Sequence, residues 1–364
     1  MKIKNHKSIV GLIQKIGLLC ILFIGVLISS FSQTNKITVK TFYGFIFPHH
    51  EVIYSKVNSP IHSLELTYSK QLAKDSIWDH LYKNPEFGIN LFYTSLGNNN
   101  VFGKEISLFP SLTFNLMKTE KIDFYSRFGL GISYNTETFD PKNNLENYAV
   151  SKPINIHFDF LLGVNYKLTP NFELKGGIKI GHFSNGNTSF PNMGMNYISS
   201  YLGAGYLFNQ PTNENKHTSK PSVPKEQNFN LFASMGFRNN RIKTKPFTLS
   251  FLYQKSVSNK WMLGTGIEIF YDKYVEFELK RKKQEFLSYY NFNSGLFINQ
   301  SLRYRKWLLS LQEGIYIMDN KLQNLAYFKA SISYCILDNY YLRASLKTHS
   351  FTADYTEIGI GYKF

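Results

Sequence analysis

A histidine and a serine stand two positions apart at His182 and Ser184, and this spacing permits chemistry. Successive side chains of a β-strand point to opposite faces, so residues two apart share a face. The imidazole of His182 can therefore reach the hydroxyl of Ser184 and take its proton, which activates the oxygen as a nucleophile. Hydrolysis of an ester by this pair is the first functional hypothesis.

Alternating apolar and polar positions predict that the pair lies on a strand of a transmembrane β-barrel. From Lys36 onward, segments of roughly ten to fourteen residues alternate in this way and are separated by turn residues. About eight such segments precede Phe208 and about eight follow Asn228. Aromatic residues make up 16% of the chain, and barrels place them in girdles at both membrane interfaces. The predicted fold class is all-β, an antiparallel transmembrane β-barrel.

The connections between these segments alternate in length, as expected for short periplasmic turns and long outer loops. The short connections are residues 117–121, 168–171, 256–260, 303–306 and 337–339. Residues 135–152 and 272–285 are long and polar, and they are predicted to be outer loops. Residues 72–85 do not fit this pattern, because they fall at a periplasmic turn and are too long for one.

The two halves of the chain resemble one another. Six positions in the first half match six in the second at one constant offset, and leucine for isoleucine is the only change among them. The matched positions are Tyr166, Asn171, Leu174, Ile178, Lys179 and Phe183, against Tyr334, Asn339, Leu342, Leu346, Lys347 and Phe351. Each half also ends on an aromatic-terminated strand, at Phe208 and at Phe364.

These patterns divide the chain into four parts. Residues 1–32 hold four lysines, an apolar run and then small residues, which is typical of a secretory signal peptide. Residues 33–208 and 229–364 are predicted barrel units, joined by a polar linker with three prolines at residues 209–228. Two tandem eight-stranded barrels fit this division, and one barrel of about sixteen strands is the alternative. The separate terminal strands favour two barrels.

The similarity between the two halves does not include the histidine and the serine. His182 and Ser184 align with Ser350 and Thr352, so the second half has no such pair in register. The second half is also shorter, and the stretch that it lacks is the one that contains Asn192. Only the first unit is therefore predicted to be catalytic, and the second is predicted to be degenerate.

Strand parity predicts which wall of the barrel carries the pair. A lysine that faces lipid near mid-bilayer costs about 2 to 4 kcal/mol, so Lys179 is expected to point into the barrel. His182 and Ser184 have the opposite parity and then face lipid. A strand that starts near Asn171 rises about 26 Å by His182, close to the height of the apolar band. The pair is therefore expected at the outer rim, where the ester groups of an outer-leaflet glycolipid lie.

The net charge and the cysteine content limit the binding partners and the disulfide bonds that can be expected. The formal net charge is +16, and an exported chain of this kind favours a negatively charged membrane surface, such as phosphorylated lipid A, over nucleic acid. The mature chain keeps only Cys335, so no internal disulfide is expected. No metal-ligand set or cofactor motif is visible, and none is predicted.

The residues around the pair resemble a known family. The matching segments are His182-Phe183-Ser184-Asn185 and Pro191-Asn192-Met193-Gly194. They are similar to the lipid A 3-O-deacylases, acyloxyacyl hydrolase-like esterases of the Gram-negative outer membrane. The resemblance implies that a Ser-His-Glu triad on the outer wall of an eight-stranded barrel removes the acyl chain at position 3 of lipid A. It makes Ser184 the nucleophile and His182 the general base, with Asn192 and Asn185 as oxyanion or positioning residues.

The chain departs from the family at Asn196, which stands where the resemblance places the glutamate. An amide oxygen can accept the imidazole N–H and fix its tautomer, but it cannot stabilise the imidazolium by charge. Glu173 and Asp159 are carboxylates on neighbouring strands, and both are expected to lie too far toward the periplasm or the middle of the barrel. A non-catalytic barrel that binds lipopolysaccharide or another partner, or a pore, therefore stays open as an alternative.

Overall fold

A computed structural model describes residues 34–47, 50–71, 77–208, 223–239, 241–318, 325–349 and 352–364. The predicted signal peptide at residues 1–32 and most of the predicted linker at residues 209–228 lie outside these ranges. No helix among the described residues has the length and apolar character needed to cross a membrane.

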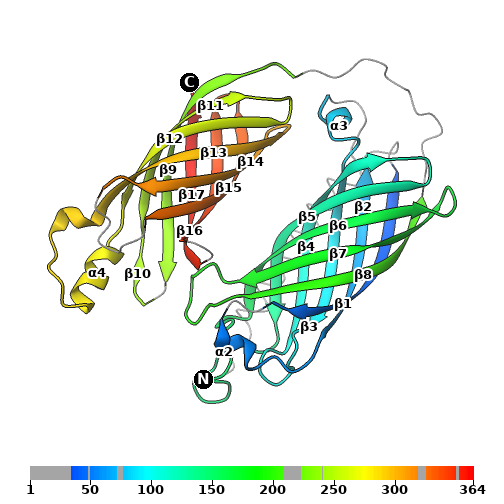
Figure 1. The fold of residues 1–364 in the computed structure, drawn as a ribbon, viewed down its shortest axis with the longest axis horizontal. Coiled ribbons are helices and arrows are strands. Elements are labelled where there is room, and N and C mark those ends of the chain that lie inside the picture. The colour runs from blue at the N-terminus through cyan, green and yellow to red at the C-terminus, as the bar shows by residue number, and fades with distance from the viewer. Residues whose placement is uncertain are drawn as a thin grey trace.

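The first half of the chain closes into an eight-stranded antiparallel barrel in which each strand pairs with its sequence neighbours and β1 pairs with β8 (Figure 1). Its strands are β1 (Asn35–Ile46), β2 (Ile61–Gln71), β3 (Glu86–Ser95), β4 (Lys104–Lys118), β5 (Ile122–Asn135), β6 (Ile154–Lys167), β7 (Phe172–Ser184) and β8 (Met195–Phe208). Buried and exposed residues alternate along them, because one face of each strand points into the lumen and the other outward.

The second half forms a separate closed barrel, in which β9 pairs with both β11 and β17. Its strands are β9 (Gln227–Asn239), β10 (Lys243–Thr244), β11 (Phe247–Ser256), β12 (Trp261–Tyr271), β13 (Phe292–Tyr304), β14 (Trp307–Tyr316), β15 (Ala326–Leu337), β16 (Tyr340–His349) and β17 (Thr352–Lys363). The prediction of two eight-stranded barrels is confirmed, with the two-residue β10 as an addition on the edge of β9. The alternative of one barrel of about sixteen strands is wrong, because each sheet closes on itself.

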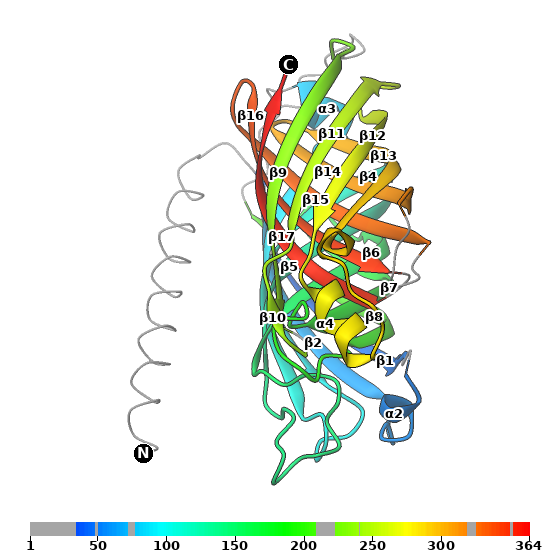
Figure 2. The same cartoon turned by 90° about the vertical axis from the view of Figure 1, so that its left-hand side faces the viewer.

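The short and long connections lie at opposite ends of the barrels. All five predicted short turns join strands as expected, among them the turn between β6 and β7. The helices α2 (Glu51–Tyr54) and α4 (Tyr274–Arg281) lie toward one end, and α3 (Ile77–Leu81) and the carboxyl terminus lie toward the other (Figure 2). The first of these ends is the outer one, since it carries the long loops. The polar stretch at residues 272–285, predicted to be a loop, contains α4, whose ion pairs between Lys280 and Glu276 and between Arg281 and Glu278 support a helix.

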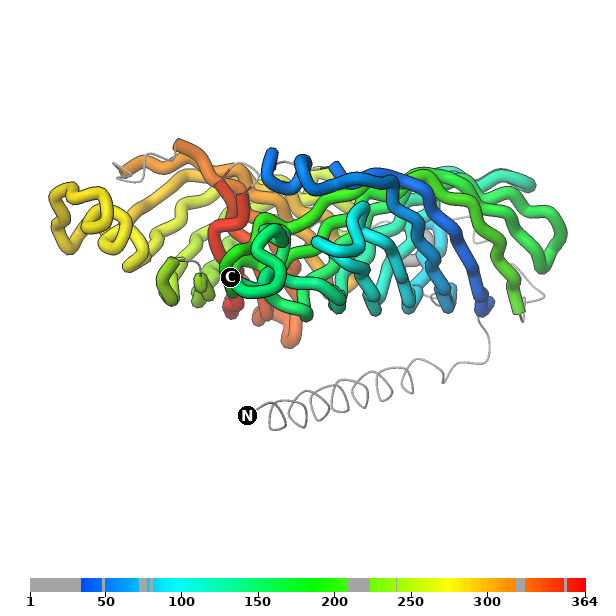
Figure 3. Tube along the Cα trace, turned by 90° about the horizontal axis from the view of Figure 1, so that it is seen from below, coloured from blue at the N-terminus to red at the C-terminus, as the bar shows by residue number. Residues whose placement is uncertain are grey.

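The structure explains the one connection that did not fit. Residues 72–85 contain α3, and Tyr82, just after it, packs in a buried cluster with Phe114 of the first barrel and Tyr304 of the second. The hydroxyl of Tyr82 also donates a hydrogen bond of 2.6 Å to the carbonyl of Arg303. The connection is long because it fastens the two barrels together at their periplasmic end. Seen from the outer end, the barrels lie side by side (Figure 3).

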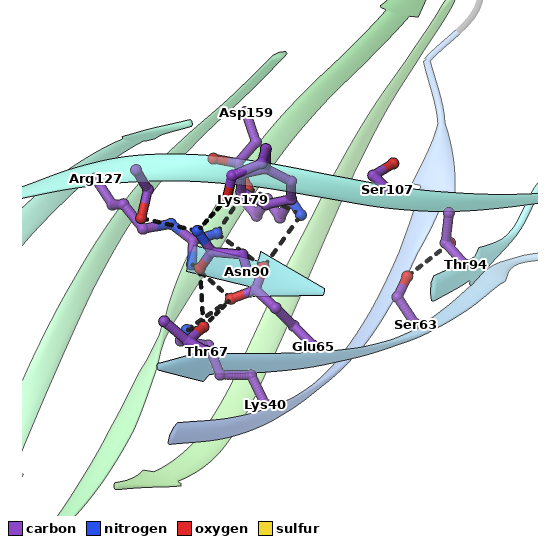
Figure 4. A network of polar contacts seen from close by, with 12 residues as sticks. Lys40, Ser63, Glu65, Thr67, Asn90, Thr94, Ser107, Arg127, Asp159 and Lys179 are labelled. Atoms are coloured by element: carbon purple, nitrogen blue, oxygen red, sulfur yellow. Dashed lines mark hydrogen bonds and ion pairs between the residues drawn. The ribbon is translucent and has the colours of Figure 1, made fainter. Parts of the chain in front are cut away.

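Charged side chains fill the lumen of the first barrel (Figure 4). The guanidinium of Arg127 donates to both carboxylate oxygens of Glu65, at 2.5 and 2.8 Å, and to Asp159 at 2.6 Å. Lys40 lies 2.7 Å from Glu65, and Lys179 lies 3.0 Å from Asp159. These five side chains are at most 4% exposed. An eight-stranded barrel is only wide enough for its own side chains, so this lumen is filled by a polar core and not by an open channel.

Loss of Arg127 is expected to destabilise the first barrel. Replacement of Arg127 by methionine leaves Glu65 and Asp159 buried with less compensating charge, which costs roughly 3 kcal/mol or more of unfolding free energy. Arg127→Lys keeps the charge but loses the bidentate hydrogen bonding to Glu65, so a smaller loss of unfolding free energy is expected. Urea unfolding in detergent micelles, followed by circular dichroism, measures both. Equal stability of Arg127→Met and the wild type would contradict a supporting role for this network.

Candidate active site

Three side chains form a continuous hydrogen-bonded chain at the outer end of β7 and β8. His182 and Ser184 lie near the end of β7, and the strand register places Asn196 of β8 directly opposite His182. His182 Nδ1 lies 2.5 Å from Asn196 Oδ1. Since an amide oxygen can only accept, Nδ1 carries the proton and Nε2 is left as an acceptor. Ser184 Oγ lies 3.1 Å from Nε2, so its hydroxyl can donate to the imidazole.

The neighbouring carboxylates are engaged elsewhere. Glu173, at the periplasmic end of β7, lies 2.9 Å from both Lys36 and Lys175. Asp159 belongs to the lumen network described above. Both point into the barrel and away from the wall that carries His182, which leaves Asn196 as the hydrogen-bond acceptor at Nδ1. The site therefore has serine, histidine and asparagine in the arrangement of a catalytic triad, without a negative charge on the third member.

The three residues face the membrane and not the lumen. Lys179 is completely buried inside the barrel, whereas His182 and Ser184, at the opposite parity, are half-buried on the outer wall. Their cross-strand partners on β6 are Phe158 and Ile156, which are 40% and 45% exposed. The site is thus an outward-facing polar group within an apolar surface, as strand alternation and the position of Lys179 predict.

The two remaining predicted residues, Asn192 and Asn185, lie in the loop between β7 and β8 and make different contacts. The backbone N–H of Asn185 donates 2.8 Å to Asn192 Oδ1, which fixes the amide of Asn192 beside Ser184 and leaves its Nδ2 group to donate. The side chain of Asn185 bonds within the loop instead, since its Oδ1 accepts from Thr188 N at 3.0 Å and its Nδ2 donates to Ser189 O at 2.9 Å. The geometry makes Asn192 an available donor and Asn185 a loop anchor.

Gly194 is a site residue to which the sequence assigned no role. Its φ of +67° lies in the left-handed region, which favours glycine. A Cβ at this position would lie 2.8 Å from His182 Cε1 and 3.2 Å from Ser184 Cβ. The backbone N–H of Gly194 donates 2.9 Å to Ala149 O in the long loop between β5 and β6, which braces the end of the loop between β7 and β8.

Gly194→Ala is expected to lower kcat by about 10- to 100-fold, because the added methyl displaces the imidazole from the hydroxyl. Gly176→Ala is the control: Gly176 lies on β7, the strand that carries His182 and Ser184, and a Cβ there would meet nothing closer than 3.5 Å. Initial rates of acyl release by the two purified variants provide the measurement. Equal rates would show that close packing at Gly194 does not position the imidazole.

A second group of serine, histidine and carboxylate lies inside the barrel and is not a competing site. His157 Nδ1 is 2.6 Å from Glu105 Oε1 and 3.2 Å from Ser107 Oγ. Both contacts meet at the same ring nitrogen, so the imidazole cannot relay a proton between them. All three side chains are fully buried in the lumen. Among the residues that the structure describes, no group of three potential metal ligands is close enough to hold a metal ion.

Comparison with known proteins identifies two family models along the chain. Residues 62–205 match "Lipid A 3-O-deacylase (PagL)", and residues 227–364 match "Acyloxyacyl hydrolase, C-terminal domain". Together the two matches cover most of the chain, one for each barrel. A search of curated proteins found no match.

Three solved structures are each similar to about half of the chain. The neisserial surface protein A has 11% identity and a TM-score of 0.33, and covers 48% of this chain and 97% of its own. The outer membrane enzyme PagL has 14% identity and a TM-score of 0.31, and covers 46% of this chain and 97% of its own. The amino-terminal barrel domain of OprF from Pseudomonas aeruginosa has 12% identity and a TM-score of 0.29, and covers 48% and 99%.

The family match spans the strands that carry the site, and its description agrees with the resemblance drawn from the motif around Ser184. Lipid A is a component of the outer membrane of Gram-negative bacteria, where a barrel of this kind resides. The chain belongs to the lipid A 3-O-deacylase family, whose members are outer-membrane ester hydrolases.

Proposed function

We propose that this protein removes the 3-O-linked acyl chain of lipid A by a serine-histidine mechanism. Ser184 is the nucleophile, His182 is the general base, Asn196 orients the imidazole, and Asn192 stabilises the oxyanion. The observation that carries the proposal is the hydrogen-bonded chain from Asn196 through His182 to Ser184, with distances of 2.5 and 3.1 Å. Nucleophile, base and orienting group stand in the order that acyl transfer requires.

The reaction follows from the positions of the protons. His182 Nε2 takes the hydroxyl proton as Ser184 Oγ attacks the ester carbonyl, and Asn192 Nδ2 donates to the oxygen that becomes negative. The tetrahedral intermediate collapses, and the imidazolium gives its proton to the sugar oxygen, which leaves. Water activated by the same imidazole then cleaves the acyl-serine ester and releases the fatty acid.

The surroundings of the site support a lipid substrate. Exposed apolar side chains surround the polar group on strands β6, β7 and β8, and they can pack against an acyl chain in the outer leaflet. These side chains are Ile156, Phe158, Ile180 and Ile198, together with Phe190 in the loop between β7 and β8 at residues 185–194, which we call the catalytic loop. The ester of a membrane lipid reaches such a surface by lateral diffusion, so no enclosed pocket is required.

A barrel that binds lipopolysaccharide without turning it over is the second candidate. The uncharged Asn196 favours it, because a site that has lost its carboxylate has lost part of its catalytic power. The experiment that tests the main proposal is mass spectrometry of lipid A exposed to the wild type and to Ser184→Ala. Variants of Asn196 separate the two candidates.

A further inference from the structure

The second barrel contacts the catalytic loop of the first. Asn187 Nδ2 donates to the backbone carbonyl of Asp354 at 3.0 Å and lies 3.4 Å from that of Ala353, both at the start of β17. In the other direction, Asn239 at the end of β9 donates from its backbone N–H to Asn187 O at 3.0 Å, and from Nδ2 to Thr188 O at 2.6 Å. Hydrogen bonds thus run both ways between the loop and the rim of the second barrel, where the two barrels lie side by side (Figure 1).

The part of the loop that makes these contacts has an unusual backbone. Gly186 and Asn187 have φ angles of +63° and +64°, so two consecutive residues adopt the left-handed conformation. Asparagine tolerates this conformation better than most residues, but at a cost in free energy that neighbouring contacts must offset. Asn187 is only 8% exposed, and a Cβ on Gly186 would lie 3.1 Å from Thr356 of the second barrel. The bend therefore packs directly against β17.

A short path leads from this contact to the nucleophile. Thr188, whose carbonyl accepts from Asn239, donates its own N–H and hydroxyl to Asn185, at 3.0 and 2.7 Å. Asn185 follows Ser184 in the chain and holds Asn192 through its backbone N–H. A displacement of Thr188 is therefore transmitted through Asn185 to both Ser184 and Asn192.

Ion pairs hold in place the part of the second barrel that contacts the loop. The guanidinium of Arg238 forms ion pairs with the carboxylates of Asp272 and Asp354, and Arg238 Nε lies 3.4 Å from the same Asp354 carbonyl that accepts from Asn187. The cluster around Tyr82 joins the barrels at the periplasmic end. Contacts at both ends restrict movement of one barrel against the other.

We propose that the second barrel is a positioning element for the active site, with Asn239 as its main positioning residue. Its rim holds the loop at residues 185–194 in the conformation that places Asn192 beside Ser184. The inference rests on the proposed function of Ser184 and gives a role to a barrel that has no histidine-serine pair of its own. It also accounts for the tandem arrangement, since the rim of the second unit completes the site of the first.

The test uses the full-length protein in micelles and the variant Asn239→Ala. Loss of the bond to Thr188 is expected to lower kcat about tenfold with little change in KM, because one hydrogen bond that orients the loop is removed. Amide hydrogen exchange within residues 185–194 is expected to become faster in the same variant. Asn239→Gln, which keeps the amide donor, is expected to recover part of kcat.

Asn293→Ala is the matched control. Asn293 lies near the outer end of β13, three strands away from β9 in the second barrel, and among the described residues its side chain accepts from the neighbouring N–H of Ser294. It is expected to leave kcat and exchange unchanged. Unchanged exchange in Asn239→Ala would overturn the assignment of the Asn239 side chain as the contact that holds the loop, and faster exchange with an unchanged kcat would overturn the positioning role. A wild type without deacylase activity would refute the proposed function, while the exchange measurement would still test the docking.

Discussion

Ser184→Ala is expected to abolish the release of a 3-hydroxyacyl chain from lipid A while the barrel stays folded. The substitution removes the hydroxyl that we propose forms the acyl-enzyme, so the rate is expected to fall about a thousandfold or more. Ser184 is half-buried at the end of β7 and supports no lumen contact, so little stability is lost. Mass spectrometry of lipid A incubated with the purified protein measures the mass lost with the acyl chain.

Three further variants test whether this loss is specific to the site. His182→Ala is expected to cost about as much as Ser184→Ala, and the double variant no more, because residues that act as a unit are not additive. Ser107→Ala removes the buried serine beside His157 and is expected to retain full activity. Unaltered lipid A with well-inserted wild-type protein would refute the proposed function, and normal activity of Ser184→Ala would refute the assignment of the nucleophile.

Variants of Asn196 are expected to change the rate in opposite directions. Aspartate has the size and shape of asparagine, so Asn196→Asp places a carboxylate oxygen where the amide oxygen now accepts from His182 at 2.5 Å. The charge stabilises the imidazolium that forms in the transition state, and a rise in kcat of about tenfold or more is expected. Asn196→Leu removes the acceptor, so the ring nitrogen of His182 that carries the proton is no longer fixed. The variant is expected to lower kcat by about 100-fold or more.

The same measurement separates an enzyme from a binding barrel. Asn100→Asp adds an equal charge in an exposed outer loop, away from His182, and is expected to leave kcat unchanged. A barrel that only binds lipopolysaccharide would release no acyl chain with either Asn196 variant. A fall in kcat for Asn196→Asp would show that the site requires a neutral third member.

Much of the site could be predicted because it depends on local rules. Alternation along a strand is a property of neighbouring residues, so the position of Lys179 in the sequence is enough to predict the lipid-facing wall. The spacing of His182 and Ser184 brings them together on any strand. Asn196 was predicted from the motif, and the structure places it beside His182 because a ten-residue loop, residues 185–194, returns the chain in that register.

Other features were not determined by the sequence, because they depend on residues far apart in the chain. The aromatic-terminated strand of each half favoured two barrels, but the pattern of strands and turns also allowed one large barrel, since the two differ in which strands close the sheet. The length of residues 72–85 is explained only by the packing of Tyr82 against Tyr304 of the other barrel. Gly194 belongs to a motif segment that carries the family resemblance, but the sequence assigned it no role, since that role comes from the approach of its backbone to His182.

The sequence by itself determined the class of fold, the wall and rim that carry the histidine and serine, and the family that the motif resembles. These depend on strand period, turn length and residue type, which act over a few neighbouring positions. Only the tertiary structure decided that the chain closes into two barrels, that Glu173 and Asp159 are held in the lumen, and that Asn239 contacts the catalytic loop. The physical reason is that closure, ion pairing and docking are set by contacts between segments distant in sequence, and many arrangements of those contacts satisfy the same local pattern.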